Sequence, residues 1–213
     1  MKLHFEPNLD YQRNAIEAVC GFGFCVADLW EASPIRFSDH QPCTAEILQW
    51  IFPGDPWLCV GSKYKFCTMH LSQFKAAADA FEQIVPSPML EKYGHTKEGK
   101  KSEHTLEATG ARRFLVIEGD GTSKDAQAAI LLHLAERAPL SLVVDSGGKS
   151  LHGWFFVAGK TDEQLAPFFS RACSLGADKA LWLRSQFVRM PDGLRDKGNR
   201  QQILFFNPRT ITR

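Results

Sequence analysis

Two carboxylates stand two residues apart in the stretch Ile117-Glu118-Gly119-Asp120-Gly121, directly after an apolar run. In an extended chain, residues two apart point to the same side, so Glu118 and Asp120 would present both carboxylates to one point. Hard divalent cations take oxygen ligands and complete their shell with substrate phosphates. The pair therefore predicts a Mg²⁺ or Mn²⁺ site, and an ordinary acidic turn after a buried strand is the alternative.

A small, basic turn follows in the stretch Ser146-Gly147-Gly148-Lys149-Ser150-Leu151-His152. Its Gly-Lys-Ser triplet is not a P-loop, because that motif needs a glycine where Val143 stands and a helix where strand-like sequence follows. We expect a hairpin whose backbone N–H groups converge on an anion together with Lys149, Ser150 and His152, which would suit a triphosphate. A plain Gly-Gly hairpin with an exposed lysine is the alternative.

A third polar group begins at Asp178, which would share one face of a helix over 177–183 with Trp182. Basic residues gather in and after this helix: Lys179, Arg189, Arg195, Lys197 and Arg200. Such a cluster predicts a local positive field for nucleotide phosphates or a template backbone. A solvated basic loop is the alternative.

The composition of the chain excludes several classes of protein and of metal site. The chain has 213 residues, and 25 Lys+Arg against 24 Asp+Glu give a net charge of +1, which excludes a histone-like electrostatic binder. The six cysteines are too sparse for a disulfide scaffold and lack the close pairs of a structural zinc site, so we expect free thiols and no structural zinc. With no apolar run long enough to span a bilayer and no signal peptide, the expected location is cytoplasmic, without a membrane partner.

The second half of the chain carries the clearer pattern. Apolar runs predict strands over 114–117, 140–144, 151–157 and 202–206, and helices start at Ser123 and Thr161 and end near 137 and 175. The order β-α-β-β-α-β predicts an α+β fold with a ferredoxin-like, RRM-like sheet.

The first half predicts helices over 10–20, capped by Asn8, over 45–51 and over 71–81, and a strand pair over 57–60 and 64–69. The chain divides near 86–110, where Pro86-Ser87-Pro88 is followed by a polar, Gly- and Lys-rich stretch over 91–109 that has few core-forming residues and predicts a loop or linker. We therefore expect an extension over 1–20, a small α/β module with its linker over 21–105, and the RRM-like catalytic palm over 106–213.

Together these motifs resemble the archaeo-eukaryotic primase superfamily, in its primase-polymerase branch of phages, plasmids and mobile elements. The similar positions are Glu118-Gly119-Asp120, then Ser150-Leu151-His152, then Asp178 with Trp182, Gln186 and Arg189 at the family's downstream spacing. The resemblance covers about residues 110–206. A glutamate at 118, where an aspartate is more usual, departs from the family pattern.

The resemblance implies a DNA primase or primase-polymerase that transfers nucleotides from NTP or dNTP onto a single-stranded DNA template. It assigns Glu118, Asp120 and Asp178 to two catalytic metal ions, and His152, Ser150 and Arg189 to the nucleotide's phosphates. Lys149 and Arg195 are additional candidates for nucleotide binding. Since the sequence ends at Arg213, the replicative helicase that many relatives carry would be a separate partner or absent.

Two other interpretations remain. A non-catalytic RRM-like module would stack bases on Trp154, Phe155 and Phe156, although core packing explains those rings as well. An inactive remnant would follow if Glu118 cannot replace aspartate. Separately, the stretch from Leu9 to Ile16, which contains Gln12, resembles the start of the helicase subunits of type III restriction enzymes, but no Walker A loop follows. We expect this stretch to be a docking helix or an extension.

Overall fold

The computed structural model describes residues 9–37, 44–62, 65–119, 121–195 and 198–211. It is a mixed α+β structure with antiparallel sheets. The α-helices are α1 (Leu9–Cys20), α2 (Val26–Ala32), α3 (Thr44–Ile51), α4 (Leu71–Phe74), α5 (Lys124–Ala135) and α6 (Asp162–Ser174). Short 3₁₀ helices are η1 (Lys75–Ala80), η2 (Lys179–Trp182) and η3 (Pro208–Thr210).

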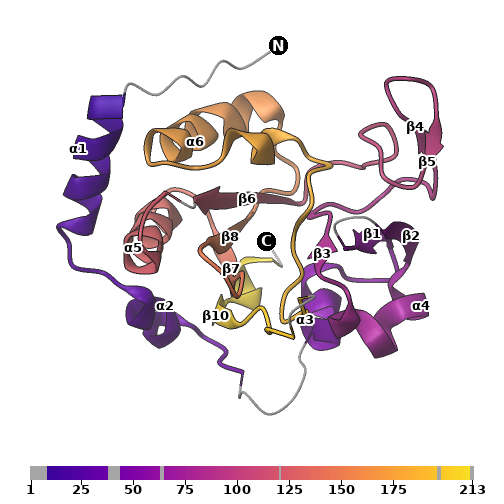
Figure 1. Ribbon diagram of the computed structural model, residues 1–213, viewed down its shortest axis with the longest axis horizontal. Coiled ribbons are helices and arrows are strands. Elements are labelled where there is room, and N and C mark those ends of the chain that lie inside the picture. The colour runs from indigo at the N-terminus through magenta and orange to yellow at the C-terminus, as the bar shows by residue number, and fades with distance from the viewer. Residues whose placement is uncertain (1–8, 38–43, 63–64, 120, 196–197, 212–213) are drawn as a thin grey trace.

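Strands form three sheets (Figure 1). The central sheet has the order β10-β7-β8-β6, formed by β6 (Phe114–Gly119), β7 (Leu140–Asp145), β8 (Leu151–Phe156) and β10 (Ile203–Phe206). The second has the order β2-β1-β3-β9, formed by β1 (Trp57–Gly61), β2 (Phe66–His70), β3 (Gln83–Ile84) and β9 (Val188–Arg189). A two-stranded ribbon pairs β4 (Gly94–His95) with β5 (Lys101–Ser102).

The central sheet contains the four strands expected from the second half of the sequence, in the expected order along the chain. Their order in space differs from the ferredoxin-like one, in which the first strand lies next to the fourth. Here β6 is an edge strand and β7 pairs with β10. The outer edge of β6 is occupied by other backbone groups: Phe114 N–H donates to Pro86 O, and Glu118 O accepts from Asp178 N–H. These two bonds use backbone groups at the edge of β6 where the fourth strand would pair in a ferredoxin-like sheet.

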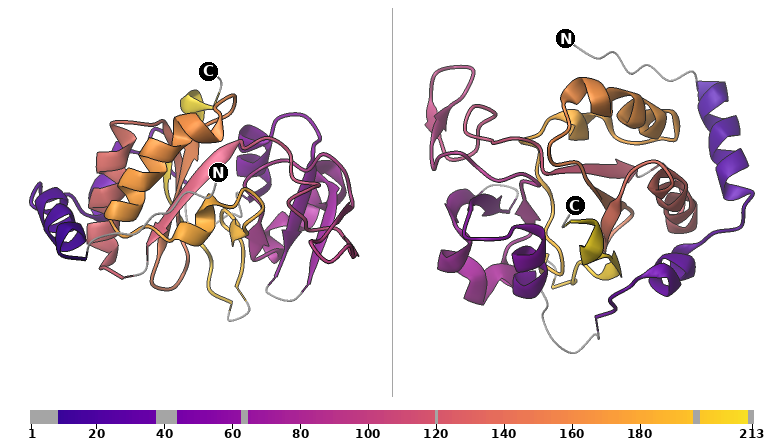
Figure 2. Two further views of the ribbon diagram at one scale, coloured as in Figure 1. Left: turned by 90° about the horizontal axis from the view of Figure 1, so that it is seen from above. Right: turned by 180° about the vertical axis from the view of Figure 1, so that it is seen from behind.

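Helices cover one face of the central sheet. Ser123 caps α5 by accepting from Ala126 N–H at 3.2 Å, and Thr161 forms a capping box with Gln164, so both expected helix starts are confirmed. Leu131 of α5 and Phe169 of α6 are buried in one apolar cluster with the alternating residues of the strands beneath. Figure 2 shows α1, α5 and α6 on one side of the central sheet.

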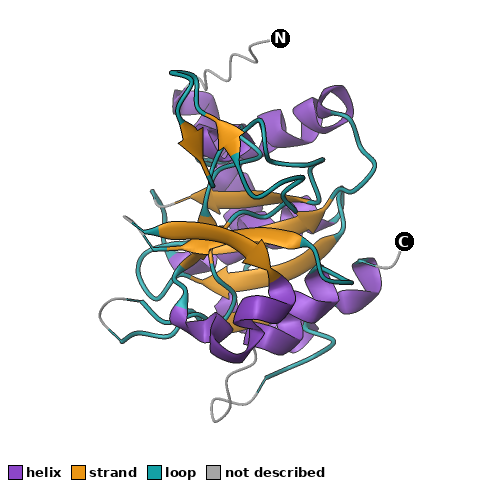
Figure 3. Cartoon of the chain, turned by 90° about the vertical axis from the view of Figure 1, so that its right-hand side faces the viewer, coloured by secondary structure: helices purple, strands orange, loops and turns teal. Residues whose placement is uncertain are grey.

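The other face of the central sheet packs against the second sheet. One apolar cluster joins Ile47 of α3 and Leu58 of β1 to Phe114, Trp154 and Val188. In the view of Figure 3 the strands of the two larger sheets therefore lie one behind the other, with helices above and below them. β9, from the second half of the chain, completes the sheet of the first half, so the core is continuous across residue 106.

Trp154 and Phe155 are both 0% exposed. They are core residues, and neither can stack a base as the RRM-like interpretation required.

Two expected helices were too long. The helix expected over 71–81 is a single turn of α4 followed by η1, with non-helical φ and ψ at Ala77, and Asp79 O accepts from Leu194 N–H outside the helix. The helix expected over 177–183 is only the four-residue η2, and Asp178 is its N-cap. Since Asp178 N–H is bonded to β6, the residue has extended backbone and cannot share a helical face with Trp182.

The stretch 86–110 is mostly irregular, as expected of a loop, but it is packed into the molecule. Ser87, Met89 and Thr109 are buried, and Met89 forms a small apolar cluster with Cys59, Val85 and Ala108. The core contacts come mainly from Ser87 and Met89 and from the end of the segment at Ala108 and Thr109, whereas the polar residues between 91 and 104 are mostly exposed, as expected of a loop.

Helix α1 packs against α5 and α6, and Gln12 donates to Cys173 O at 3.3 Å. The first helix is thus packed onto the helices that cover the central sheet. Among the helices that the structure describes, none is both long and apolar enough to cross a membrane. The expected cap Asn8 and the expected strand start at Tyr64 lie outside the described residues.

Candidate functional site

Glu118 lies at the carboxyl end of β6, on the sheet face that packs against the first half of the chain. Side chains alternate along the strand: Phe114 and Val116 belong to the cluster between the two sheets, and Glu118 follows them on that face. His152 stands directly opposite on β8, in register with Glu118. The sheet therefore brings together one carboxylate and one imidazole from strands far apart in sequence.

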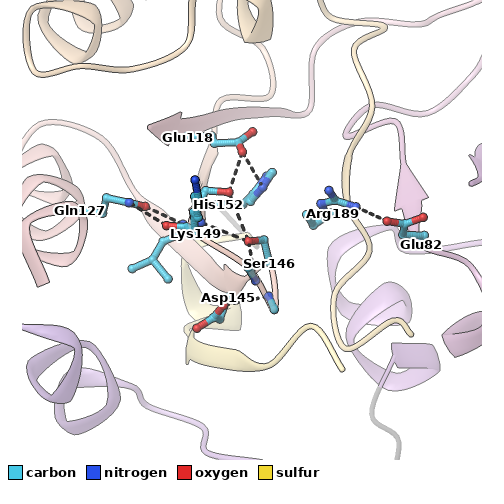
Figure 4. A network of polar contacts seen from close by, with 12 residues as sticks. Glu82, Glu118, Gln127, Asp145, Ser146, Lys149, His152 and Arg189 are labelled. Atoms are coloured by element: carbon cyan, nitrogen blue, oxygen red, sulfur yellow. Dashed lines mark hydrogen bonds and ion pairs between the residues drawn. The ribbon is translucent and has the colours of Figure 1, made fainter. Parts of the chain in front are cut away.

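The Glu118 carboxylate has two close partners. Ser150 Oγ donates to Oε1 at 2.7 Å, and His152 Nε2 lies 3.2 Å from the same oxygen (Figure 4). Burial alone would raise the pKa of Glu118, but His152, Ser150 and the nearby Arg189 together hold that pKa below its ordinary value. Glu118 is thus kept ionised at neutral pH.

The imidazole of His152 is only 3% exposed. Its contact with Glu118 has the distance of an ion pair without hydrogen-bond geometry, and Nδ1 is buried with no hydrogen-bond partner among the described residues. The described residues therefore leave the ring nitrogens of His152 without a hydrogen-bond partner. A buried polar atom without a partner is costly, so each one in a folded protein requires a physical explanation.

The turn between β7 and β8 forms a hairpin as expected, but it is not an open nest for an anion. Gly147 N–H donates to Asp145 Oδ1 at 2.9 Å, and the N–H groups of Gly148 and Ser150 both donate to Ser146 Oγ. These donors are used inside the turn, so a phosphate here would depend on side chains. The Lys149 side chain is exposed and available for that contact.

Gln127, a buried residue of α5, anchors this hairpin. Its Nε2 donates to Thr122 O at 2.9 Å and to Lys149 O at 3.0 Å, and its Oε1 accepts from Leu151 N–H at 2.7 Å. The amide thereby ties the loop after β6 to the hairpin that carries Ser150. The sequence signal was a glutamine in the apolar run of a helix, which needs a buried partner.

Asp178 is placed beside Glu118 by the backbone. Its N–H donates to Glu118 O at 2.7 Å, and its carboxylate, on an exposed residue, caps η2 by accepting from Ala180 N–H at 2.9 Å. The second carboxylate of the expected metal site, Asp120, lies outside the described residues. Within the described residues, no group of three His, Cys, Asp or Glu side chains is close enough to hold a metal ion.

Arg189 and Arg195 converge on a residue that the sequence analysis missed. Arg189 Nη1 donates to Glu82 Oε1, and Arg195 Nε lies 3.6 Å from the same oxygen. Glu82 is 8% exposed, and its backbone O accepts from Met190 N–H and from Gln201 Nε2. The missed signal was a charged residue directly before the short strand β3, where a buried carboxylate requires partners.

The basic cluster expected after Asp178 is therefore largely compensated. Besides the two arginines on Glu82, Arg200 forms ion pairs with Asp192 at 3.1 Å and Asp79 at 3.7 Å. The expectation of a local positive field was wrong for these three arginines, because Glu82 and Asp79 from the first half of the chain and Asp192 from the second half neutralise them. Lys197 lies outside the described residues.

Arg195 also connects the two parts of the site. Its Nη1 donates to Ser146 O at 3.1 Å, so one side chain joins the hairpin to Glu82. Figure 4 shows Glu118 and His152 above this hairpin and the Arg189–Glu82 pair beside it.

A pocket of about 220 Å³ opens at the same end of β6 but on the opposite face of the sheet. It is lined mainly by apolar side chains and glycines, including Ile16, Gly119, Gly121 and Gly176. Glu118 and His152 do not line it, so the polar site and this pocket are separate.

Comparisons with known proteins do not assign the chain to a family. No family model and no curated protein matches the chain. Among solved structures, the polymerase domain of Mycobacterium tuberculosis ligase D in complex with DNA is similar at 16% identity, over 87% of this chain and 75% of that one, with a TM-score of 0.36. We base no inference on a likeness of this size.

Proposed function

We propose that this chain is a nucleotidyltransferase of the primase-polymerase type, which adds nucleotides from NTP or dNTP to a strand on a single-stranded DNA template. The observation that carries the proposal is the convergence of Glu118, Ser150 and His152 at the end of β6. Arg189 is close enough to lower the pKa of Glu118. These residues come from separate motifs that resemble those of one enzyme superfamily.

Each residue has a chemical role in this proposal. His152 and the exposed Lys149 would contact the phosphates of the incoming nucleotide, where positive charge and N–H donors stabilise the transition state. Arg189 would face the same phosphates while Glu82 fixes its position. Ser150 would orient the carboxylate of Glu118.

The donor types fit a divalent cation, because Glu118 is held ionised and Asp178 is an exposed carboxylate bonded through its backbone to Glu118. We propose that Glu118, Asp120 and Asp178 hold Mg²⁺ or Mn²⁺. Such ions lower the pKa of an attacking hydroxyl and stabilise the charge on the leaving oxygen.

The test is incorporation of labelled nucleotide on a single-stranded DNA template, with and without a primer, in Mg²⁺ or Mn²⁺. Asp120→Ala and Glu118→Gln should lower the rate at least about 100-fold, because losing a metal ligand removes several kcal/mol of transition-state stabilisation at about 1.4 kcal/mol per tenfold. Glu46→Gln, which changes an exposed glutamate of α3, is the matched control and should keep the parent rate. If the parent incorporates nothing, or if both site variants match it, the proposal is wrong.

A further inference from the structure

A shallow groove of about 430 Å³ lies along η2, which begins directly after Asp178. Three basic side chains line it: Arg112, Lys179 and Arg184. One acid, Asp162, lines it as well, so the groove carries an excess of positive charge. Leu106 and Leu183, which are 41% and 46% exposed, add apolar surface.

The positive charge of this groove is less compensated than that around Arg189. Among the described residues, no acid lies within ion-pair distance of Lys179 or Arg184, and the single contact of Arg112 with Asp162 is long, at 3.4 Å. Burial lowers the pKa of the Arg112 guanidinium, the contact with Asp162 opposes this, and the nearby Arg184 adds a smaller lowering effect. In a chain of net charge +1, unpaired cations concentrated on one concave surface are a specific feature.

The walls of the groove are held in place by backbone contacts. Arg112 Nη2 donates to Trp182 O at 2.8 Å, and its guanidinium lies 4.9 Å from the Trp182 ring. Arg184 donates through Nε to Thr109 O and through Nη2 to Leu106 O, both at 3.3 Å. Guanidinium groups fixed in this way lose little entropy when they bind an anion.

We infer that this groove binds the phosphodiester backbone of a single-stranded nucleic acid. A positively charged groove with an aromatic side chain is the combination that binds single strands, since phosphates meet the cations and bases stack on the ring. Trp182 lines this groove beside the cations. The groove adjoins Asp178, and Asp178 is bonded to Glu118, so a strand in the groove runs toward the polar site. The choice of a template strand over an acidic peptide rests on the proposed function.

The experiment measures the fluorescence anisotropy of labelled single-stranded oligo-dT with the full chain at several salt concentrations. The variant Lys179→Gln/Arg184→Gln removes both unpaired cations, and Arg13→Gln/Lys75→Gln makes the same charge change at two exposed positions outside the groove. We expect the groove variant to bind at least about 10-fold more weakly. Its salt dependence should be shallower by about 1.4 in log–log slope, for two lost phosphate contacts on a single strand.

Equal binding by the parent and the groove variant, or an equal loss in the control variant, would overturn the inference. Competition by polyglutamate as strong as that by unlabelled oligo-dT would also overturn it, in favour of an acidic peptide. Circular dichroism spectra and thermal melts of both variants check that they fold like the parent.

The anisotropy assay measures binding without catalysis. The variant Glu118→Gln, which changes the polar site and not the groove, is measured in the same assay. Loss of binding confined to the groove variant supports the groove even if no variant incorporates nucleotide. Conversely, incorporation by a groove variant that binds the template as tightly as the parent would refute the groove and leave the proposed function standing.

Discussion

Replacing Gln127 by leucine tests the hydrogen bonds that hold the hairpin under Glu118. Leucine has a similar volume but cannot replace the three hydrogen bonds to Thr122 O, Lys149 O and Leu151 N–H. The Leu151 residue is 1% exposed, so its N–H would be left buried without a partner at a cost of about 1–3 kcal/mol. The two carbonyl groups belong to more exposed residues and can regain water, which adds about 0.5–1 kcal/mol each.

The expected loss for Gln127→Leu is therefore about 2–5 kcal/mol in the free energy of unfolding. Urea denaturation followed by tryptophan fluorescence measures it, with an unchanged m-value showing that both variants unfold from comparable native states. Gln49→Leu makes the same chemical change at an exposed position of α3 and should cost less than about 0.5 kcal/mol.

Amide hydrogen exchange provides a local readout of the same bonds. The Leu151 amide should exchange faster in Gln127→Leu, relative to amides of β6, because its acceptor is gone. A loss below about 1 kcal/mol, or a loss in Gln49→Leu as large as in Gln127→Leu, would refute the reasoning that the amide anchors the hairpin.

Two further predictions concern charge. Glu82→Gln leaves Arg189 and Arg195 without their shared counter-charge and should lower the free energy of unfolding by about 3 kcal/mol. This loss is at the lower end of the range for breaking a buried ion pair, since the arginine side chains remain 21% and 30% exposed. Urea denaturation measures the loss, and a loss no greater than that of Glu46→Gln would contradict the prediction. The lowered pKa of Glu118 predicts that its ionised form contributes stability above the unfolded pKa of about 4.3, which is lost as pH falls through the lower folded pKa. Urea denaturation is measured between about pH 6 and pH 3, a range that brackets both pKa values. The difference in stability between the parent and Glu118→Gln should shrink on acidification. A constant difference would argue against a lowered pKa of Glu118 in the folded protein.

Local signals in the sequence predicted the regular elements of the second half well. Ser123 and Thr161 precede apolar periodic segments and do cap α5 and α6. The apolar runs around Phe114 and Trp154 are strands, with burial on both faces. These features depend on neighbouring residues, so a single sequence suffices to find them.

Elements with competing long-range contacts were predicted less well. A helix through Ala177 and Leu181 is locally reasonable, but the hydrogen bond from Asp178 N–H to Glu118 O replaces a helical one. The strands β3 and β9 have two residues each, and they exist because they pair with a neighbouring strand. No local pattern encodes that pairing.

The candidate site divides in the same way. The sequence by itself determined that Glu118 ends a buried strand and that Ser150 and His152 lie on or beside a later one, because alternation and turn chemistry act over a few residues. Only the tertiary structure decided that β6 pairs with β8, which places His152 opposite Glu118. It also decided that Arg189 meets Glu82, 107 residues away in sequence, which turns an apparent basic cluster into a neutralised one. The physical reason is that the electrostatic environment of a charge depends on its neighbours in space, and those are set by the packing of the two sheets.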